Sequence, residues 1–350
     1  MKTILVTGGA GYIGSHTTQK LLNHGYAVVV LDNLSSGFRE AVSDQAVFVQ
    51  GDIRNTQLID QIIKQFKIDC VIHFAAKLLV EESVAKPYEY YENNVLGALS
   101  VLSACKINNI DKFIFSSTAA VYGEVNNNQL INEDSPTQPI NPYGESKLMV
   151  EKILCDAEKA YGLKSIVLRY FNVAGAATNG LNGQRTKNAT HLIKIATETA
   201  LDVRSEIKIF GTDYSTPDGT CLRDYIHVED LADAHVLATD YLLGGGTSQT
   251  LNCGYGKGYS VKEIIQTVNS VSGKDFTVKM APRRNGDPAC LIADSGRIKS
   301  ILHWKPKNDN IELICLSAFV WEKNHRHGVV NSTNQFVTNR ITTTPSELEP

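Results

Sequence analysis

The first half of the chain alternates short hydrophobic runs with amphipathic stretches. The runs lie at 3–7, 27–31, 47–49, 70–74, 113–116 and 165–169, and the amphipathic stretches at 13–23, 57–66, 89–107 and 143–160. Continuous hydrophobic runs predict strands that are covered on both faces, and the stretches between them have helical periodicity. This succession predicts an α/β fold built on a doubly wound parallel sheet.

The pattern becomes less regular after Gly175. Residues 178–187 have the composition of a loop, and helical stretches at 190–201, 228–243 and 261–271 are separated by short strands and glycine turns. We expect residues 1–177 to form a dinucleotide-binding domain, with a returning segment near 222–250. Residues 178–221 and 251–328 are expected to form a smaller mixed α/β substrate domain, and the polar residues 329–350 a mobile tail.

Composition narrows the classes of function. The chain has 350 residues, a formal net charge of −3 and 43% hydrophobic residues, so it can bury a large core but has no basic surface for nucleic acid. Neither a signal peptide nor a membrane-spanning run is evident, so no membrane partner is expected. The seven cysteines are dispersed without a CxxC pair. Such spacing favours reduced thiols in the cytoplasm and neither a disulfide framework nor a metal site.

A glycine-rich loop, TGGAGYIG at residues 7–14, follows the first predicted strand and opens the first predicted helix. Gly9, Gly11 and Gly14 fit the pattern GxGxxG, whereas Gly8, Gly11 and Gly14 fit GxxGxxG. Side chains at these positions would keep a pyrophosphate away from the backbone N–H groups of the helix N-terminus. The loop therefore predicts a Rossmann-type dinucleotide site, although an ordinary tight turn has the same composition.

Acidic residues follow the second and third strands. Asp32 lies at about the ~20-residue distance at which an acid binds the adenosine ribose hydroxyls. A carboxylate there repels a 2′-phosphate, so NAD is favoured over NADP. Asp52, in the sequence Gly51-Asp52-Ile53, is a candidate adenine contact or simply a turn residue.

The stretch NPYGESK at residues 141–147 places a tyrosine and a lysine on one face of a helix. Asn141 has the features of an N-cap, and Tyr143 and Lys147 lie one turn apart. A phenol titrates near ~10, but an ammonium close to it favours the phenolate, so Tyr143 is a candidate base. Thr118, directly after the strand 113–117, could share a proton with Tyr143 or only cap the strand end.

Several motifs resemble, in order, those of the extended short-chain dehydrogenase/reductases. They are TGGAGYIGSH, DNLSSG, GDIRN, VIHFAA, SSTAAVYG, PYGESK, RYFNVAGA, RDYIHVEDLADAH and APRRNGDPA, and the resemblance covers roughly residues 1–328. The chain most resembles the members that invert C4 of a UDP-hexose. The resemblance implies NAD as cofactor, a UDP-sugar substrate in the second domain, and a role in galactose metabolism or nucleotide-sugar supply. It also implies a homodimer formed through the helices 89–107 and 143–160.

The resemblance assigns roles to individual residues. Tyr143 matches the base that takes the 4-hydroxyl proton while hydride leaves C4 for NAD, Lys147 its partner and ribose ligand, and Thr118 the hydroxyl partner. Hydride then returns to the opposite face of a transient 4-keto sugar. Substrate-binding positions are matched by Thr118, Tyr143, Asn172, Arg223, Arg284 and Asp287. Cofactor-binding positions are matched by Gly8, Gly11, Tyr12, Ile13, Gly14, Asp32, Asn33, Asp52, Ile53, Phe74, Ala75, Asn93 and Lys147.

Two positions depart from the family pattern. Leu78 occupies a site that is lysine in some members, and Lys77 lies one place earlier. Whether Lys77 contacts the cofactor in place of that lysine is therefore open. Leu291, next to Cys290, occupies the position that limits the sugar pocket; its intermediate size leaves acceptance of N-acetylated sugars open.

Two other functions remain as alternatives. A nucleotide-sugar 4,6-dehydratase or decarboxylase shares the first oxidation, but the acidic pair that follows the threonine in dehydratases is replaced here by Ala119 and Ala120. A non-catalytic NAD-binding module would be free to lose Tyr143 and Lys147, and both are present.

Overall fold

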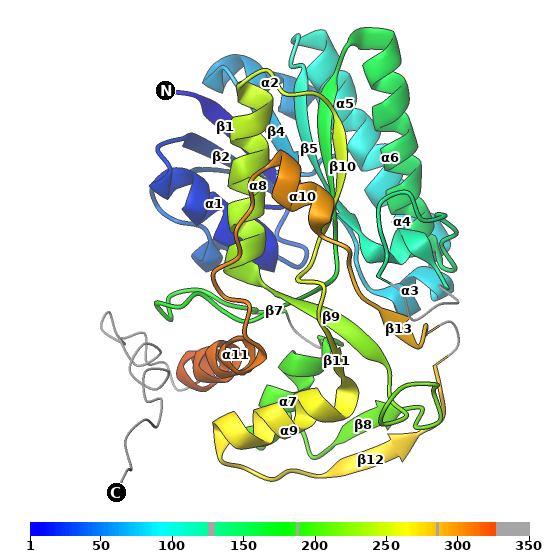
Figure 1. The fold of residues 1–350 in the computed structure, drawn as a ribbon. Helices are drawn as coiled ribbons and strands as arrows, with labels where there is room; N and C mark the ends of the chain where they lie inside the picture. The colour runs from blue at the N-terminus through cyan, green and yellow to red at the C-terminus, as the bar shows by residue number, and fades with distance from the viewer. Residues whose placement is uncertain (125–129, 187–188, 285–286, 327–350) are drawn as a thin grey trace, which may run out of the picture.

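A computed structural model describes residues 1–124, 130–186, 189–284 and 287–326. Its upper half in Figure 1 is a seven-stranded parallel sheet with the strand order β10-β6-β5-β4-β1-β2-β3. This order confirms the predicted doubly wound arrangement. The strands are β1 (Thr3–Thr7), β2 (Ala27–Asp32), β3 (Val47–Gln50), β4 (Cys70–His73), β5 (Lys112–Thr118), β6 (Lys164–Tyr170) and β10 (Gln249–Cys253).

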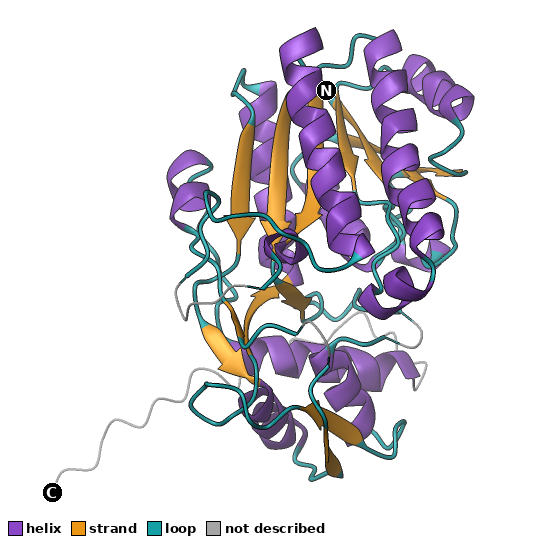
Figure 2. Cartoon of the chain, turned by 90° about the vertical axis from the view of Figure 1, so that its right-hand side faces the viewer, coloured by secondary structure: helices purple, strands orange, loops and turns teal. Residues whose placement is uncertain are grey.

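Helices cover both faces of this sheet (Figure 2). On β1, Ile4 and Val6 belong to the core beneath α1 (Tyr12–Asn23) and α8 (Val228–Leu243), whereas Leu5 belongs to the core on the opposite face. That second core lies under α2 (Thr56–Phe66), α5 (Gly97–Ile107) and α6 (Pro142–Tyr161). Because alternate side chains enter different cores, the strands are hydrophobic without interruption, as the sequence pattern predicts.

The lower half contains two smaller sheets. One has the order β11-β9-β13 with β7 paired to β9, and the other is the parallel pair β12-β8. The strands are β7 (Asn172–Ala174), β8 (Ile207–Phe210), β9 (Leu222–His227), β11 (Gly258–Ser260), β12 (Val278–Ala281) and β13 (Cys290–Leu291). The helices here are α7 (Leu192–Ala200), α9 (Val261–Ser272) and α11 (Ile311–Arg326), while α10 (Gly296–Ile301) packs near β10.

The stretch 89–107, predicted as one helix, is divided into three pieces. A short helix α4 (Pro87–Tyr90), preceded by α3 (Val80–Ala85), leads into a π-helical turn η2 (Tyr91–Leu96) and then into α5. The turn carries Asn94, whose buried amide bonds to the backbone of Lys77 and to the hydroxyl of Ser146. Such π turns depart from the hydrogen-bonding register of an α-helix and often occur at functional sites.

Short 3-10 turns complete the described structure: η1 (Arg39–Ala41) and η3 (Ala119–Tyr122). Residues 178–186 are irregular, in agreement with the predicted loop, and residues 187 and 329–350 lie outside the described residues. Within the described part of the chain, no helix combines the length and hydrophobicity needed to cross a membrane.

Candidate active site

The glycine loop joins β1 to the N-terminus of α1. Gly8 has a φ of +74°, and a Cβ there would lie 2.6 Å from the backbone nitrogen of Ala75. A Cβ on Gly14 would lie 2.3 Å from the carbonyl oxygen of Gly8. These two glycines are therefore required by backbone packing, which also brings the predicted cofactor positions Phe74 and Ala75 against the loop.

Gly11 has different surroundings. It is the N-cap of α1, with φ −77°, and no side chain of the described residues caps the N–H groups of the first turn, which includes Tyr12 and Ile13. A Cβ on Gly11 would meet only the carbonyl oxygen of Gly8, at 3.2 Å. An uncapped helix N-terminus beside an open glycine fits a phosphate group, so this loop has the features that a dinucleotide requires.

Asp32 lies at the end of β2 and is buried. Its carboxylate accepts hydrogen bonds from Ala10 N at 3.0 Å and Leu34 N at 2.8 Å. Burial raises the pKa of Asp32, and the two backbone donors lower it. Asp32 therefore also holds the glycine loop in place, a structural role that the sequence pattern did not indicate.

Asn33 and Asp52 meet at the ends of β2 and β3. The amide of Asn33 donates to Asp52 at 3.1 Å, and the guanidinium of Arg54 donates to both carboxylate oxygens of Asp52 at 2.9 Å. The bonds from Arg54 hold the pKa of Asp52 well below its usual range. Ile53 is buried and lies next to Gly97. The structure thus brings the predicted adenosine-side residues together.

The predicted Asn93 donates to the amide oxygen of Asn94 at 3.0 Å. Asn94 is the more buried of the two, and its bonds to Lys77 and Ser146 tie the π turn to α6. The ammonium of Lys77 pairs with Glu89 and lies 3.9 Å from Glu82. Lys77 is therefore engaged by carboxylates on α3 and α4.

Tyr143, Thr118 and Lys147 converge where β5 ends beside the first turns of α6. The hydroxyl of Thr118 is close enough to Tyr143 to lower the pKa of the phenol, and it accepts a hydrogen bond from Ala120 N at 3.1 Å, as a cap at the strand end would. Lys147 is buried, and its Nζ donates to the carbonyl oxygen of Ser116 at 2.8 Å. These contacts place a phenol, a hydroxyl and an amine at the carboxyl edge of the sheet.

Protonation in this cluster is governed by burial. Burial raises the pKa of Tyr143, whereas the nearby hydroxyl of Thr118 lowers it; the net direction is opposite to the lowering that the sequence pattern predicts. The reason is that desolvation disfavours the phenolate. Burial likewise lowers the pKa of Lys147 to about 7, and the charge of Glu151 opposes this shift.

Glu151, one turn beyond Lys147, was missed by sequence reasoning. Val150 and Leu154 of the same helix are buried, and Glu151 is buried beside them. It forms an ion pair with Arg169 of β6 at 2.5 Å. The available signal was the spacing of Glu151 from Lys147, which equals that of Lys147 from Tyr143.

The predicted substrate residues lie on the smaller sheets and the adjoining loops. Arg223 of β9 donates to Asp287 at 3.0 Å, and the backbone N–H of Asp287 donates to the carbonyl of Arg284. The guanidinium of Arg284 lies 3.9 Å from the centre of the Phe210 ring. Leu291 pairs with Arg223 across β13 and β9 and packs on the apolar cluster that contains Ala119. Leu291 thus connects Arg223 with the segment that follows Thr118.

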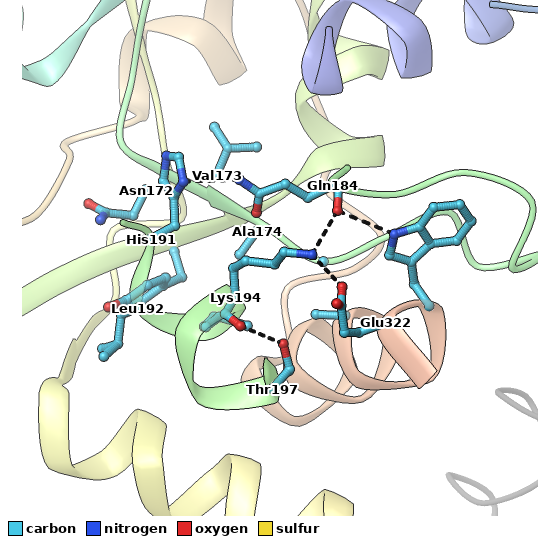
Figure 3. Close-up of a pocket in the computed structure, with 14 residues that line it drawn as sticks. Asn172, Val173, Ala174, Gln184, His191, Leu192, Lys194, Thr197 and Glu322 are labelled. Carbon is cyan, nitrogen blue, oxygen red and sulfur yellow. Dashed lines mark hydrogen bonds and ion pairs between the residues drawn. The ribbon is translucent and has the colours of Figure 1, made fainter. Parts of the chain in front are cut away.

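Asn172, at the start of β7, lines a separate small cavity of about 20 Å³, enough for one water molecule (Figure 3). Lys194 of α7 crosses this cavity to pair with Glu322 of α11 and donates to the carbonyl of Gln184 at 3.1 Å. Asn172 is the only predicted site residue in its wall. The cavity is therefore distinct from the cluster around Tyr143.

Comparisons with known proteins give consistent matches. Residues 4–254, which include the glycine loop, Thr118, Tyr143 and Lys147, match the sequence model of the NAD dependent epimerase/dehydratase family. The chain is 52% identical over 326 residues to a UDP-glucose 4-epimerase of Azospirillum brasilense, covering 93% of each chain.

Two solved structures resemble the fold over nearly all of its length. The UDP-glucose 4-epimerase of Bifidobacterium longum, in complex with NAD+ and UDP, is 38% identical with a TM-score of 0.88, covering 93% of this chain and 100% of that one. The UDP-Glc/GlcNAc 4-epimerase of Campylobacter jejuni is 47% identical with a TM-score of 0.82, again covering 93% and 100%.

Proposed function

Because the chain belongs to the NAD dependent epimerase/dehydratase family, we propose that it interconverts UDP-glucose and UDP-galactose by inverting C4 of the hexose, with NAD as its cofactor. The observation that carries this proposal is the meeting of Tyr143 and Thr118 at the carboxyl edge of a sheet whose first turn is an open glycine loop. Ligands of such sheets bind at that edge. The physiological role is galactose metabolism or nucleotide-sugar supply.

The residues divide the chemistry as follows. Tyr143, with Thr118, takes the proton of the 4-hydroxyl and later returns it. When bound, oxidised NAD supplies a hydride acceptor and a positive charge that offsets the burial of the phenol. The glycine loop, Asp32 and Lys147 hold the dinucleotide. Arg223 and Arg284 hold the diphosphate, because guanidinium groups match phosphate oxygens, while the sugar turns to present its other face.

This assignment corresponds to a division into domains. In this division, residues 1–177 and the segment near 222–250 form the NAD-binding domain, and residues 178–221 and 251–328 form the UDP-sugar-binding domain. The dehydratase alternative is disfavoured because the hydroxyl of Thr118 is followed by the methyl groups of Ala119 and Ala120, which cannot transfer protons.

A second activity on UDP-N-acetylhexosamines is supported by Leu291. Its side chain lies between the arginine cluster and the segment that follows Thr118, where the sugar must be placed. Leucine leaves more room there than tyrosine, and a relative that is 47% identical is a UDP-Glc/GlcNAc 4-epimerase.

A homodimer and a cytoplasmic location complete the proposal. Exposed apolar side chains on α5 and α6, Leu99, Ile107 and Tyr161, support pairing through these helices. Leu99→Glu is expected to convert a dimer to a monomer in light scattering, and a wild-type monomer would contradict the pairing. All seven cysteines are unpaired, as in a reducing compartment.

The decisive experiment is incubation of the purified chain with UDP-galactose. We expect UDP-glucose to form without net accumulation of NADH, because the hydride is returned. A stable 4-keto-6-deoxy sugar would instead identify a dehydratase, and NAD binding without turnover would identify a binding module. UDP-N-acetylgalactosamine in a parallel reaction tests the second activity.

A further inference from the structure

Three side chains at successive turns of α6 contact three successive residues at the end of β5. Tyr143 faces the hydroxyl of Thr118, and the ammonium of Lys147 donates to the carbonyl of Ser116. Glu151 accepts a hydrogen bond of 2.5 Å from the hydroxyl of Ser117. The first two contacts belong to the proposed reaction centre, whereas the third has no assigned role.

Glu151 is fixed in turn by Arg169. The guanidinium donates to one carboxylate oxygen at 2.5 Å and to the other at 3.1 Å, and both residues are buried. Arg169 is also the register partner of Ser117 across β5 and β6. A contribution to stability does not by itself explain a buried ion pair, because the desolvation of the two charges opposes their attraction.

The same ion pair reaches both sides of Thr118. On one side, Glu151 holds the hydroxyl of Ser117. On the other, Arg169 donates at 3.1 Å to the hydroxyl of Tyr122, which ends the turn η3 after Thr118. A displacement of either contact would therefore move the Thr118 hydroxyl relative to Tyr143.

We propose that Glu151 is a positioning residue for the reaction: with Arg169 it fixes the last residues of β5, so that Thr118 meets Tyr143 and the Ser116 carbonyl meets Lys147. This inference rests on the proposed function. Its physical basis is that a misplacement of about 1 Å can slow an enzyme on the order of 10²-fold.

Glu151 also acts on Lys147 through its charge. It lies one turn from Lys147 and favours the ammonium, opposing the effect of burial. Of the titratable groups on the surrounding elements, Tyr143 lies on the same helix and His73 of β4 interacts with the charge of Lys147, whereas Tyr170 of β6 faces Tyr143 and Arg169 faces Glu151. Loss of the carboxylate charge is therefore expected to deprotonate Lys147 at lower pH.

The sharpest test is Ser117→Ala in the full chain, because it removes one hydroxyl and leaves the Glu151–Arg169 pair intact. We expect kcat for UDP-galactose to fall roughly 10- to 100-fold with KM unchanged, since the UDP-binding residues lie elsewhere. An unchanged kcat in a folded Ser117→Ala variant would overturn the inference. An inactive wild-type protein would instead overturn the proposed function.

Variants of Glu151 separate charge from shape. Glu151→Gln removes the charge, so kcat falls and the high-pH limb of the kcat profile moves to lower pH. Glu151→Asp keeps the charge, so the high-pH limb of the kcat profile stays at the wild-type pH. Its kcat still falls, because the shorter side chain withdraws from Ser117. If Glu151→Gln does not fold, the kcat values of Ser117→Ala and Glu151→Asp test the inference in its place.

Asp230→Asn is the matched control. Asp230 is a buried acid on α8 that accepts hydrogen bonds from Tyr255 at 2.6 Å and from Asn308 N at 2.9 Å, away from β5. We expect this variant to lose stability while keeping its kcat per folded molecule and its pH profile. If the Glu151 variants behaved in the same way, Glu151 would be only structural and the inference would be wrong.

Discussion

Gly11→Ala should separate folding from cofactor binding. The backbone at Gly11 has φ −77°, which alanine adopts without strain, and the added Cβ meets only the carbonyl oxygen of Gly8 at 3.2 Å. On its remaining sides the methyl group projects into the space beside the first turn of α1. A pyrophosphate bound to those N–H groups would have to occupy that space.

The size of the effect follows from two opposing contributions to stability. Alanine is a poorer N-cap than glycine by up to about 1 kcal/mol, and it lowers the entropy of the unfolded chain by about 0.4–1 kcal/mol. The free energy of unfolding should therefore change by less than about 1 kcal/mol. Loss of one hydrogen bond to a charged phosphate costs about 1.5–3 kcal/mol, which weakens NAD binding by about 10- to 150-fold.

Gly14→Ala is the matched comparison. Its Cβ would lie 2.3 Å from Gly8 O and 2.9 Å from the Cα of Gly9, both backbone atoms that cannot move aside cheaply. We expect a loss of at least about 1–3 kcal/mol of stability, in addition to the loss of NAD.

The assay is NAD titration of each variant alongside thermal unfolding without added NAD. Gly11→Ala should unfold within about 4 °C of the wild type yet bind NAD weakly. A folded Gly11→Ala protein with wild-type NAD affinity would refute the placement of the pyrophosphate at this loop.

Three further predictions concern the reaction, acid stability and specificity. Tyr143→Phe should keep NAD bound but lower kcat on the order of 10²–10⁴-fold, as measured with UDP-galactose; full activity would exclude Tyr143 as the base. Burial lowers the pKa values of His16 and His235 to about 4 and of His73 to about 3, from an ordinary value of 6.5. Because these histidines are neutral in the folded protein, the stability that they contribute is fully present above pH 6.5 and is lost as the pH falls. The free energy of unfolding should decrease by about 2 kcal/mol for each histidine between roughly pH 7.5 and 5. Equal urea midpoints at the two pH values would contradict this prediction. Leu291→Tyr should reduce turnover of UDP-N-acetylgalactosamine about 10-fold or more relative to UDP-galactose, and an unchanged ratio would remove Leu291 from the sugar pocket.

Local signals predicted the elements that carry the proposed reaction centre. Asn141 caps α6 by accepting from Gly144 N at 2.9 Å, and Pro142 is the first helical residue, as the motif indicates. The six strands predicted in the first half are present, with ends that differ by no more than two residues. These features depend on side chains close in sequence, so a single sequence contains the information that specifies them.

The later strands depend on distant contacts and were not predicted in detail. β10 joins the large sheet beside β6 although its sequence, QTLNC, contains Asn252. Asn252 is fully buried because its amide group accepts from Tyr122 at 2.6 Å and donates to the carbonyl of Ile131 at 2.7 Å. Partners more than a hundred residues away satisfy this polar group, so no local pattern indicates its burial.

The burial of Glu151, at the proposed reaction centre, is likewise not indicated by the local sequence. An acid on a helix is ordinarily solvated, so its spacing from Tyr143 and Lys147 carried little weight by itself. The parallel register of β5 and β6 changes this, because it places Arg169 beside Ser117 on the face that α6 covers. Each charge is then tolerated in the core only because the other is present. A pair that is costly to bury and that holds the residues on both sides of Thr118 is better explained by the geometry needed for proton transfer than by stability alone.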